Sequence, residues 1–238
     1  MGLVVARARW PVRAHQLEPP DFHAVFEVWL DNGWWLVDPT RLAPVEGLVR
    51  IACGRDAADI RLLPVSKTVP EERLRTAFAA GITQMGENKV QEAQRKSENL
   101  ADLGISWSVI GHLQTNKAKN VAAFADEFQA LDSLRLAEAL DRRLQAAGRG
   151  LDVYVQVNSS GEPSKFGLEP DDVADFLAAL PAYSSLRVRG LMTLAANTSD
   201  EARVRECFSI MRRLRETFGF EGTPIEIGMR IREKRKRR

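Results

Sequence analysis

The chain of 238 residues is 45% hydrophobic and 28% charged, a composition typical of a soluble globular protein. Its formal net charge of +2 is near balance, so charge alone indicates neither a nucleic-acid partner nor a membrane surface. Two cysteines, Cys53 and Cys207, are too few for a disulfide framework and fit a reducing compartment, and no His/Cys cluster indicates a metal. Because no apolar run has the length of a signal peptide or a membrane span, we expect a cytoplasmic protein.

The first part of the chain contains a hairpin signal. Residues 1–20 have no clear period, and no structure is predicted for them. Two runs rich in β-forming residues follow, at 22–30 and 34–40, with an Asn-Gly pair between them. This pattern predicts a β-hairpin whose two-residue turn is Asn32-Gly33.

The hairpin resembles the histidine and aspartate segments of transglutaminase-like cysteine enzymes. The resemblance implies that His23 is the base and Asp38 its orienting partner in a cysteine hydrolase. Such a triad needs an upstream cysteine, and both cysteines of this chain follow His23. The predicted turn would also pair Asp38 with Glu27 instead of His23. We therefore interpret residues 21–54 as a remnant of such a domain that serves only as structure.

From residue 60 onward, short apolar runs alternate with helical patterns, which indicates an α/β fold with a parallel sheet. The runs predict strands at 60–65, 82–85, 107–110, 128–131, 153–157 and 188–193. The helical patterns cover 71–80, 90–103, 116–125, 134–147, 170–180 and 199–218. Six such units without a long linker predict a TIM-type (β/α) barrel, which is incomplete, since an eight-unit barrel needs two more. The alternative is an open doubly wound sheet.

Four residues mark the expected ends of these helices. Gly81 and Gly219 suit the left-handed position that follows a helix. Ser133 can cap the helix at 134–147, and Pro170 fits the first helical position of the next one.

The first apolar run of this region brings a lysine, Lys67, to the end of a strand. In a barrel of parallel strands, side chains at the C-terminal strand ends line the mouth of the active site. We expect Lys67 to be half-buried, and burial lowers the pKa of an ammonium group until the neutral amine can attack a carbonyl. Lys67 is therefore a candidate Schiff-base lysine; the alternative is a lysine whose head group reaches solvent at a strand end.

Further motifs follow the later strands in a fixed order. They are Gly86-Glu87-Asn88-Lys89, Ile110-Gly111-His112-Leu113-Gln114-Thr115-Asn116-Lys117, Val155-Gln156-Val157-Asn158, Lys165-Phe166-Gly167-Leu168 and Gly190-Leu191-Met192-Thr193. With the Lys67 strand, this ordered set closely resembles the pyridoxal phosphate homeostasis proteins, which are related to the barrel domain of alanine racemase. The resemblance covers about residues 60–220, and its specificity lies in the ordered set rather than in any one motif.

The resemblance implies that the chain binds pyridoxal 5'-phosphate through a Schiff base to Lys67, in vitamin B6 and amino-acid homeostasis. The implied cofactor-binding residues are Lys67, Asn88, His112, Asn158 and Met192. Racemases of this barrel type also use a tyrosine from another domain as a second base, and neither Tyr154 nor Tyr183 is a convincing candidate. We therefore expect binding without substrate turnover.

Each of these residues also has a plain structural alternative. Asn88 could donate a hydrogen bond toward the cofactor ring or cap the helix at 90–103. His112 could serve the site, together with Asn116, or be a core or capping histidine. Asn158 should point toward the barrel mouth, and Met192 should pack against a ring.

Lys165 follows the fifth predicted strand, in a polar loop after Gly161-Glu162-Pro163. It could pair with an acid or a phosphate, or it could simply be solvated. The sequence alone leaves both roles open.

The end of the chain departs from the family pattern. The seventh strand of the family, with its serine-rich phosphate loop, has no counterpart after Phe220, and Ile227-Gly228 resembles only the final strand. We therefore expect the phosphate to add little affinity, unless Gly228 and the arginines around it rebuild a phosphate site. Another hypothesis is a fused or truncated chain with an impaired cofactor site, whose barrel does not close.

The predicted organisation is an unassigned segment at 1–20, the hairpin remnant at 21–54, a cofactor-binding barrel at 56–220 and a basic tail at 221–238. The expected partner is one small-molecule cofactor. We expect a monomer without a membrane or nucleic-acid partner, although the basic tail leaves nucleic acid open.

Overall fold

The computed structural model describes residues 62–198 and 200–220 and five further strands. These strands are β1 (Leu3–Arg7), β2 (Phe22–Leu30), β3 (Gly33–Val37), β4 (Leu48–Arg50) and β11 (Ile227–Gly228). The chain divides into two compact units, residues 1–62 with 224–227 and residues 63–223 with 228–238. Asp38, Cys53 and the tail after residue 228 lie outside the described residues, and for His23 the strand is described but not the side chain.

The strands of the first unit form an antiparallel sheet in the order β3-β2-β1-β4. The predicted hairpin is confirmed, whereas strand β1 lies in the segment for which the sequence predicted no structure. Trp29 pairs with Trp34, so residues 31–32 connect the strands, and the predicted pairing of Glu27 with Asp38 is wrong.

The second unit contains the predicted alternation of strands and helices. Its strands are β5 (Leu62–Leu63), β6 (Gln84–Glu87), β7 (Ser106–Val109), β8 (Glu127–Leu131), β9 (Leu151–Val157) and β10 (Leu186–Thr193). Its α-helices are α1 (Glu71–Ala79), α2 (Val90–Asn99), α3 (Ala118–Phe124), α4 (Leu134–Ala147), α5 (Val173–Ala179) and α6 (Glu201–Thr217). Short 3-10 turns are η3 (Ala101–Leu103), η4 (Thr115–Lys117), η5 (Pro170–Asp172) and η6 (Leu180–Ala182).

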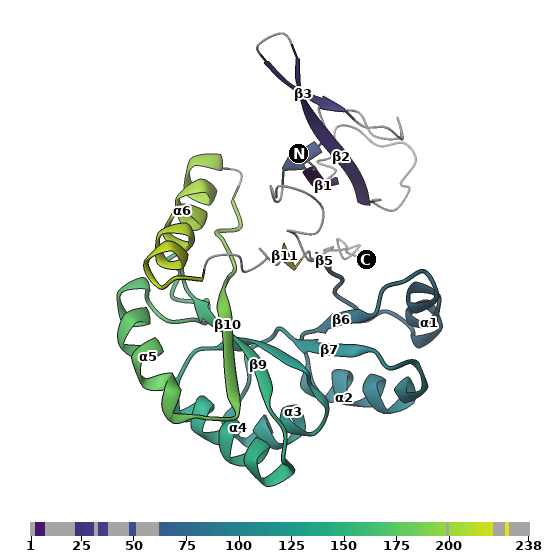
Figure 1. Cartoon of the computed structure of the whole chain (residues 1–238), viewed down its shortest axis with the longest axis vertical. Helices are drawn as coiled ribbons and strands as arrows, with labels where there is room; N and C mark the ends of the chain where they lie inside the picture. Colours follow the sequence, from purple (N-terminus) through teal and green to yellow (C-terminus); the bar gives the residue numbers. More distant parts are fainter. Residues whose placement is uncertain are drawn as a thin grey trace, which may run out of the picture. The chain divides into compact units, whose positions relative to one another are not determined.

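The strands follow one another around the sheet in chain order. Strands β6 to β10 form a five-stranded parallel sheet in the order β10-β9-β8-β7-β6, and a parallel bridge from Val65 to Gly86 continues this order to the segment after β5. Strand β11 pairs with β5 in a separate two-stranded sheet. A doubly wound sheet would reverse its strand order at a switch point, so the described strands match the predicted barrel and exclude that alternative. Figure 1 shows helices α1 to α5 arranged along the outer side of these strands.

Residues alternate between the two faces of the strands, as the period of two requires. On the outer face, Val109, Phe128 and Val153 are fully buried in the main apolar core. They pack there with Leu140 and Leu144 of α4, which lie on the buried side of that amphipathic helix. This burial attaches the helical layer to the sheet.

The inner face of the same strands is polar. Gln84 Nε2 donates a hydrogen bond of 3.1 Å to Ser108 Oγ, and Ser108 Oγ donates one of 2.8 Å to Glu127 Oε1. Gln129 Nε2 donates to the same oxygen at 2.6 Å. Three successive strands are therefore joined across the inner face by side chains as well as by backbone bonds.

Strand β10 lies at one edge of the five-stranded sheet. Its two exposed arginines, Arg187 and Arg189, both bind Asp152 of β9, and the Arg189 Nε to Asp152 Oδ2 distance is 2.9 Å. This edge of the described sheet therefore carries a cluster of charged side chains.

The helix ends agree with most of the local signals. Gly81 and Gly219 have the positive φ angles of +96° and +69° expected of the residue after a helix, and Pro170 begins η5. Ser133 occupies the N-cap position of α4, but its side chain makes no capping hydrogen bond, so that part of the prediction is wrong. Its backbone carbonyl accepts the amide hydrogens of Leu136 and Ala137 instead.

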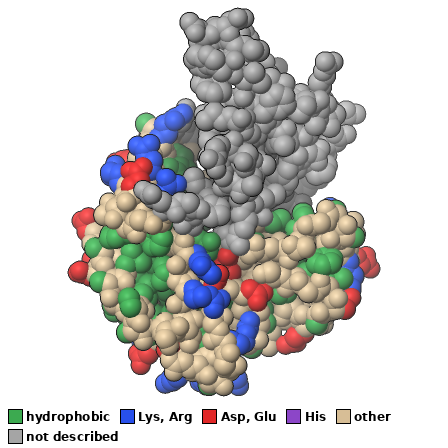
Figure 2. Space-filling model, in the orientation of Figure 1, with side chains coloured by type: hydrophobic (Ala, Val, Ile, Leu, Met, Phe, Trp, Pro, Cys, Tyr) green, Lys and Arg blue, Asp and Glu red, His purple; other side chains and the backbone are tan. Residues whose placement is uncertain are grey.

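An apolar hollow of about 610 Å³ lies between α5, β10 and the residues after α6. Leu177, Val188, Phe218 and Phe220 are among its lining residues, and Figure 2 shows hydrophobic side chains gathered over this region. None of the residues expected to bind the cofactor lines this hollow. The expected site is therefore elsewhere, at the C-terminal ends of the strands.

Within the described residues, no helix combines the length and the apolar character that crossing a membrane requires. The same residues contain no group of three histidine, cysteine or acidic side chains that could hold a metal ion. Cys207 is buried and free, as expected of a core residue.

Helix α4 offers a test of how strongly the core stabilises the barrel. Leu140 is fully buried, whereas Leu134 on the same helix is 39% exposed. We predict that Leu140→Ala lowers the free energy of unfolding by about 2–5 kcal/mol, because it removes buried methyl groups and leaves a cavity. The matched change Leu134→Ala should alter it by less than about 0.5 kcal/mol. Urea denaturation followed by circular dichroism measures both, and equal losses would contradict the assignment of the core.

Candidate functional site

Lys67 is half-buried, as predicted, and lies in a tight turn just after β5. The amide of Val69 donates to the carbonyl oxygen of Ser66 at 3.0 Å and closes this turn. The Ser66 amide donates to Gly86 O at 2.9 Å, which fixes the turn beside the end of β6. Two strand ends therefore hold the backbone around Lys67.

The residue after Lys67 has an unusual conformation. Thr68 has a φ of +61°, and no other non-glycine residue among the described ones has a positive φ. Glycine or asparagine normally takes that position of a turn, because a β-branched side chain is strained there by about 1–3 kcal/mol. Contacts around the turn must offset this strain.

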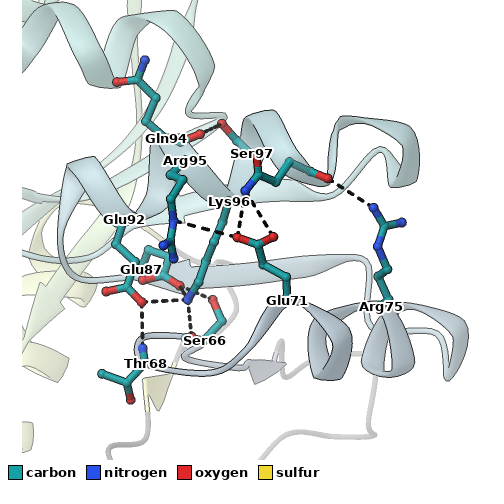
Figure 3. A network of polar contacts seen from close by, with 11 residues as sticks. Ser66, Thr68, Glu71, Arg75, Glu87, Glu92, Gln94, Arg95, Lys96 and Ser97 are labelled. Atoms are coloured by element: carbon teal, nitrogen blue, oxygen red, sulfur yellow. Dashed lines mark hydrogen bonds and ion pairs between the residues drawn. The ribbon is translucent and has the colours of Figure 1, made fainter.

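A buried polar network lies against the same turn, as Figure 3 shows. Lys96 of α2 is 1% exposed, and its Nζ donates at 2.7 Å to Ser66 O, at 2.7 Å to Glu87 Oε1 and at 2.9 Å to Glu92 Oε1. Ser66 Oγ donates to Glu87 Oε1 at 2.7 Å, and the Thr68 amide donates to Glu92 Oε1 at 2.8 Å. The network therefore binds the residues on both sides of Lys67.

The carboxylates of this network differ in their surroundings. Burial raises the pKa of the Glu92 carboxyl, but hydrogen bonds from Lys96 and from the Thr68 amide outweigh that effect, so its pKa is lowered. Glu87 is fully buried, and its Oε2 has no hydrogen-bond partner among the described residues. The position of Glu87 therefore depends on the bonds to its other oxygen.

Asn88 follows β6 and is exposed beside the end of β7. The residue that caps α2 is Lys89, whose side chain makes no capping bond, so the alternative of Asn88 as a helix cap is wrong. A Cβ atom on Gly111 would collide with Asn88 O and lie 2.6 Å from its Oδ1. Gly111 thus permits the close approach of the loops that follow β6 and β7.

His112 has two partners at the strand ends. Its Nδ1 lies 3.3 Å from Asp132 Oδ2, and its ring stacks on Phe166 with 3.7 Å between the centroids. Burial raises the pKa of the Asp132 carboxyl, although the nearby His112 lowers it in part. These contacts join the loops after β7, β8 and β9, whereas Asn116 is exposed in η4.

Asn158 lies just after β9, where the sequence predicted that its side chain would point toward the barrel mouth. Its side chain is 5% exposed and is bonded within its own loop, donating to Glu162 O at 3.1 Å and accepting from Ser160 Oγ at 3.0 Å. A Cβ atom on Gly167, which has a φ of +123°, would lie 2.8 Å from the Asn158 amide nitrogen. The glycine and the asparagine thus shape the loop after β9.

Lys165 and Met192 complete the expected residues. Lys165 Nζ donates to Ala195 O at 2.8 Å and to Glu162 Oε1 at 3.0 Å, so Lys165 pairs with an acid and is not simply solvated. Met192 is half-buried and packs against the main core. Lys165 thus links the loops after β9 and β10, whereas Met192 lies within β10.

The sequence patterns did not indicate Lys96, Glu92, Asp132 or Phe166 as residues of the site. One signal could have indicated Lys96, because Val90 and Ala93 precede it at intervals of three on the buried side of α2. A lysine at an apolar position of an amphipathic helix needs a buried partner. The partners themselves lie on other elements and leave no local pattern.

Titration of Asp132 gives a test of the contacts around His112. Because the folded pKa of Asp132 is raised, the folded chain retains a proton that the unfolded chain loses, and stability falls as the pH rises between the two pKa values. We predict that the wild type loses stability relative to Asp132→Asn between about pH 4 and about pH 7. Urea denaturation of both proteins at these two pH values measures the difference in stability.

The matched control is Asp102→Asn. A hydrogen bond from Arg75 lowers the pKa of Asp102, so any contribution of Asp102 is lost as the pH falls. The two variants should therefore differ in the sign of their pH dependence. A pH-independent difference between the wild type and Asp132→Asn would contradict the burial of this carboxyl.

The chain is similar to known proteins of one family. A model of the family of alanine racemase N-terminal domains matches residues 56–229. A pyridoxal phosphate homeostasis protein of Pseudomonas aeruginosa is 40% identical over 163 residues, which are 68% of this chain and 71% of that protein. The protein of the same name from Escherichia coli K12 is 37% identical over 169 residues, or 70% of this chain and 71% of that one.

Solved structures show the same fold. PipY of Synechococcus elongatus with pyridoxal phosphate bound has a TM-score of 0.61 and 28% identity, with 71% of this chain and 91% of that chain covered. Alanine racemase of Clostridium difficile has a TM-score of 0.57 at 14% identity over 71% of this chain and 46% of that chain, which shows the fold alone. The chain therefore belongs to the family of pyridoxal phosphate homeostasis proteins, built on the barrel of the alanine racemase N-terminal domain.

Proposed function

We propose that this chain binds pyridoxal 5'-phosphate through a Schiff base to Lys67 and acts in vitamin B6 and amino-acid homeostasis without turning over a substrate. The observation that carries the proposal is the half-buried Lys67, held in a turn at the strand ends of the barrel. Relatives that cover most of this chain are named as homeostasis proteins of this cofactor, and the PipY structure contains it.

The chemistry requires an amine, an aldehyde and little else. The neutral Lys67 nitrogen attacks the aldehyde carbon of the cofactor, a C=N bond forms and one water leaves. The chain supplies the nitrogen at a fixed place, since both neighbours of Lys67 are bonded to other elements.

Other residues at the strand ends fit a flat aromatic ring. Asn88 is exposed there, and the stacked rings of His112 and Phe166 offer an aromatic surface between the loops after β7 and β9. Asn158 and Met192 lie just after β9 and near the end of β10, with one side chain bonded in its loop and the other packed on the main core. Only Lys67 bonds covalently.

Binding without turnover is part of the proposal. Tyr154 is buried within β9, and Tyr183 packs against the main core beside η6. Both tyrosines thus have packing roles, and neither supports a second catalytic base. The family to which the chain belongs is named for homeostasis of the cofactor, in contrast to the racemases that share its fold.

We predict that the purified chain, incubated with pyridoxal phosphate and dialysed, shows the absorbance band of a protonated Schiff base. Borohydride reduction should fix the cofactor on Lys67, as found by mass spectrometry of peptides. Lys67→Ala should abolish the band, because the nitrogen that attacks the aldehyde is absent. The exposed Lys119 on α3 gives the matched control, and Lys119→Ala should retain the band. A band that survives Lys67→Ala would refute the proposed linkage.

We place cofactor binding in residues 56–220, with the segments 1–20, 21–54 and 221–238 outside the site. In this proposal the protein acts as a cytoplasmic monomer whose partner is the small-molecule cofactor, without nucleic acid. Light scattering after gel filtration should give the mass of one chain, 26.6 kDa, with a single cooperative melting transition. A larger mass, or aggregation, would instead support an unclosed barrel that pairs through its strand edges.

A further inference from the structure

The ion pair between Lys96 and Glu87 occupies a place where neighbouring strands carry apolar residues. Glu87 pairs in register with Val109, and Val109 pairs with Phe128, so the three residues belong to one layer on the outer face of the sheet. Val109 and Phe128 are fully buried in the apolar core, whereas Glu87, equally buried, faces Lys96. A helix and strand could be packed here without any charge.

Burying two charges is costly, and apolar residues of similar volume often stabilise a fold as well or better. The charged pairs nearby are closer to solvent. Arg75 and Asp102 are both exposed. Arg95, next to Lys96 in the sequence, is 64% exposed, and its Nε lies 3.8 Å from Glu71 Oε1. The buried pair is therefore distinguished by its surroundings, and its role should be sought in what else it bonds.

Those bonds lead to the turn that carries Lys67. Lys96 Nζ donates to Ser66 O, and that same carbonyl oxygen closes the turn by accepting from the Val69 amide. Glu92, which also accepts from Lys96, holds the Thr68 amide at the residue with positive φ. The residues before and after Lys67 are thus bound to one ammonium group, directly or through one carboxylate.

We propose that Lys96, paired with Glu87 and Glu92, is a positioning residue that holds the Lys67 turn in its strained form and so presents the Lys67 amine to an aldehyde. The Lys96 ammonium does not touch the cofactor; it acts on Lys67 through Ser66 O and through the Thr68 amide. The link to the cofactor rests on the proposed function, whereas the holding of the turn concerns this chain alone.

A neutralised pair separates this role from folding. Lys96→Met alone leaves Glu87 buried without its cation, and such a variant loses stability for that reason. In Glu87→Gln/Lys96→Met no charge of the pair remains, while Ser66 O and Glu92 both lose their ammonium donor. Arg95→Met removes an adjacent exposed charge of the same helix and is the matched control. Glu92→Gln is a further variant that retains the buried pair.

The first measurement is hydrogen–deuterium exchange of the cofactor-free chain, read on a peptide that contains residues 66–69. We expect the Thr68 and Val69 amides to exchange at least about tenfold faster in the double variant, because the bonds that hold the turn are lost. The same amides of Arg95→Met should exchange as they do in the wild type. The double variant should melt within about five degrees of the wild type. Unchanged exchange in the double variant would overturn the proposal, whatever the cofactor does.

The second measurement is titration with pyridoxal phosphate over a range of pH. We expect the Schiff base to form at least about tenfold more weakly in the double variant. Glu92→Gln should weaken its formation in the same sense, and Arg95→Met should not. Faster exchange combined with an unchanged titration would overturn the positioning role. If the wild type forms no Schiff base, the proposed function fails, and the exchange experiment still decides whether Lys96 holds the turn.

Discussion

One buried nitrogen atom holds together the corner of the barrel that carries the candidate site. A lysine side chain that is 1% exposed must have every proton of its ammonium group accepted, because an unsatisfied charge in the interior is far costlier than an exposed one. Lys96 meets this requirement with oxygens from three places: the segment after β5, the end of β6 and its own helix. The same constraint that satisfies the ammonium group therefore fixes a helix, a strand end and a turn relative to one another. The conformation of Thr68 can persist because this corner is over-determined.

Much of the fold follows from patterns that are local in the sequence. The six strand-helix units of the barrel lie close to their predicted bounds, and α4 has the predicted bounds of 134–147, because apolar periodicity and glycine at helix ends act within a few residues. The hairpin was also predictable, but its register was not. An Asn-Gly pair favours one turn, whereas the pairing of Trp29 with Trp34 depends on the strands on either side.

The candidate site was predictable only in part. Lys67 follows from its place at a strand end, and its partial burial agrees with that inference. Its support does not, since Lys96 reaches Ser66 across 30 residues of sequence. Asn158 shows the converse: a polar residue after alternating valines resembles a site residue, yet hydrogen bonds within its own loop take up the side chain. Sequence patterns indicate which residues stand at the strand ends, but hydrogen bonds to distant segments or within a loop decide how the side chains lie.

The charged edge of the described sheet has a consequence for the behaviour of the protein in solution. A strand at the edge of a sheet offers unpaired backbone groups to any other strand that approaches, which is a common route to aggregation. On β10 the two arginines stand at alternate positions, 187 and 189, and each is half-exposed while it shares the carboxylate of Asp152. A second strand that paired there would have to desolvate or displace this positively charged pair. Arg187 and Arg189 thus place positive charge along the β10 edge of the described sheet, and charged side chains on an edge strand disfavour its pairing with another strand.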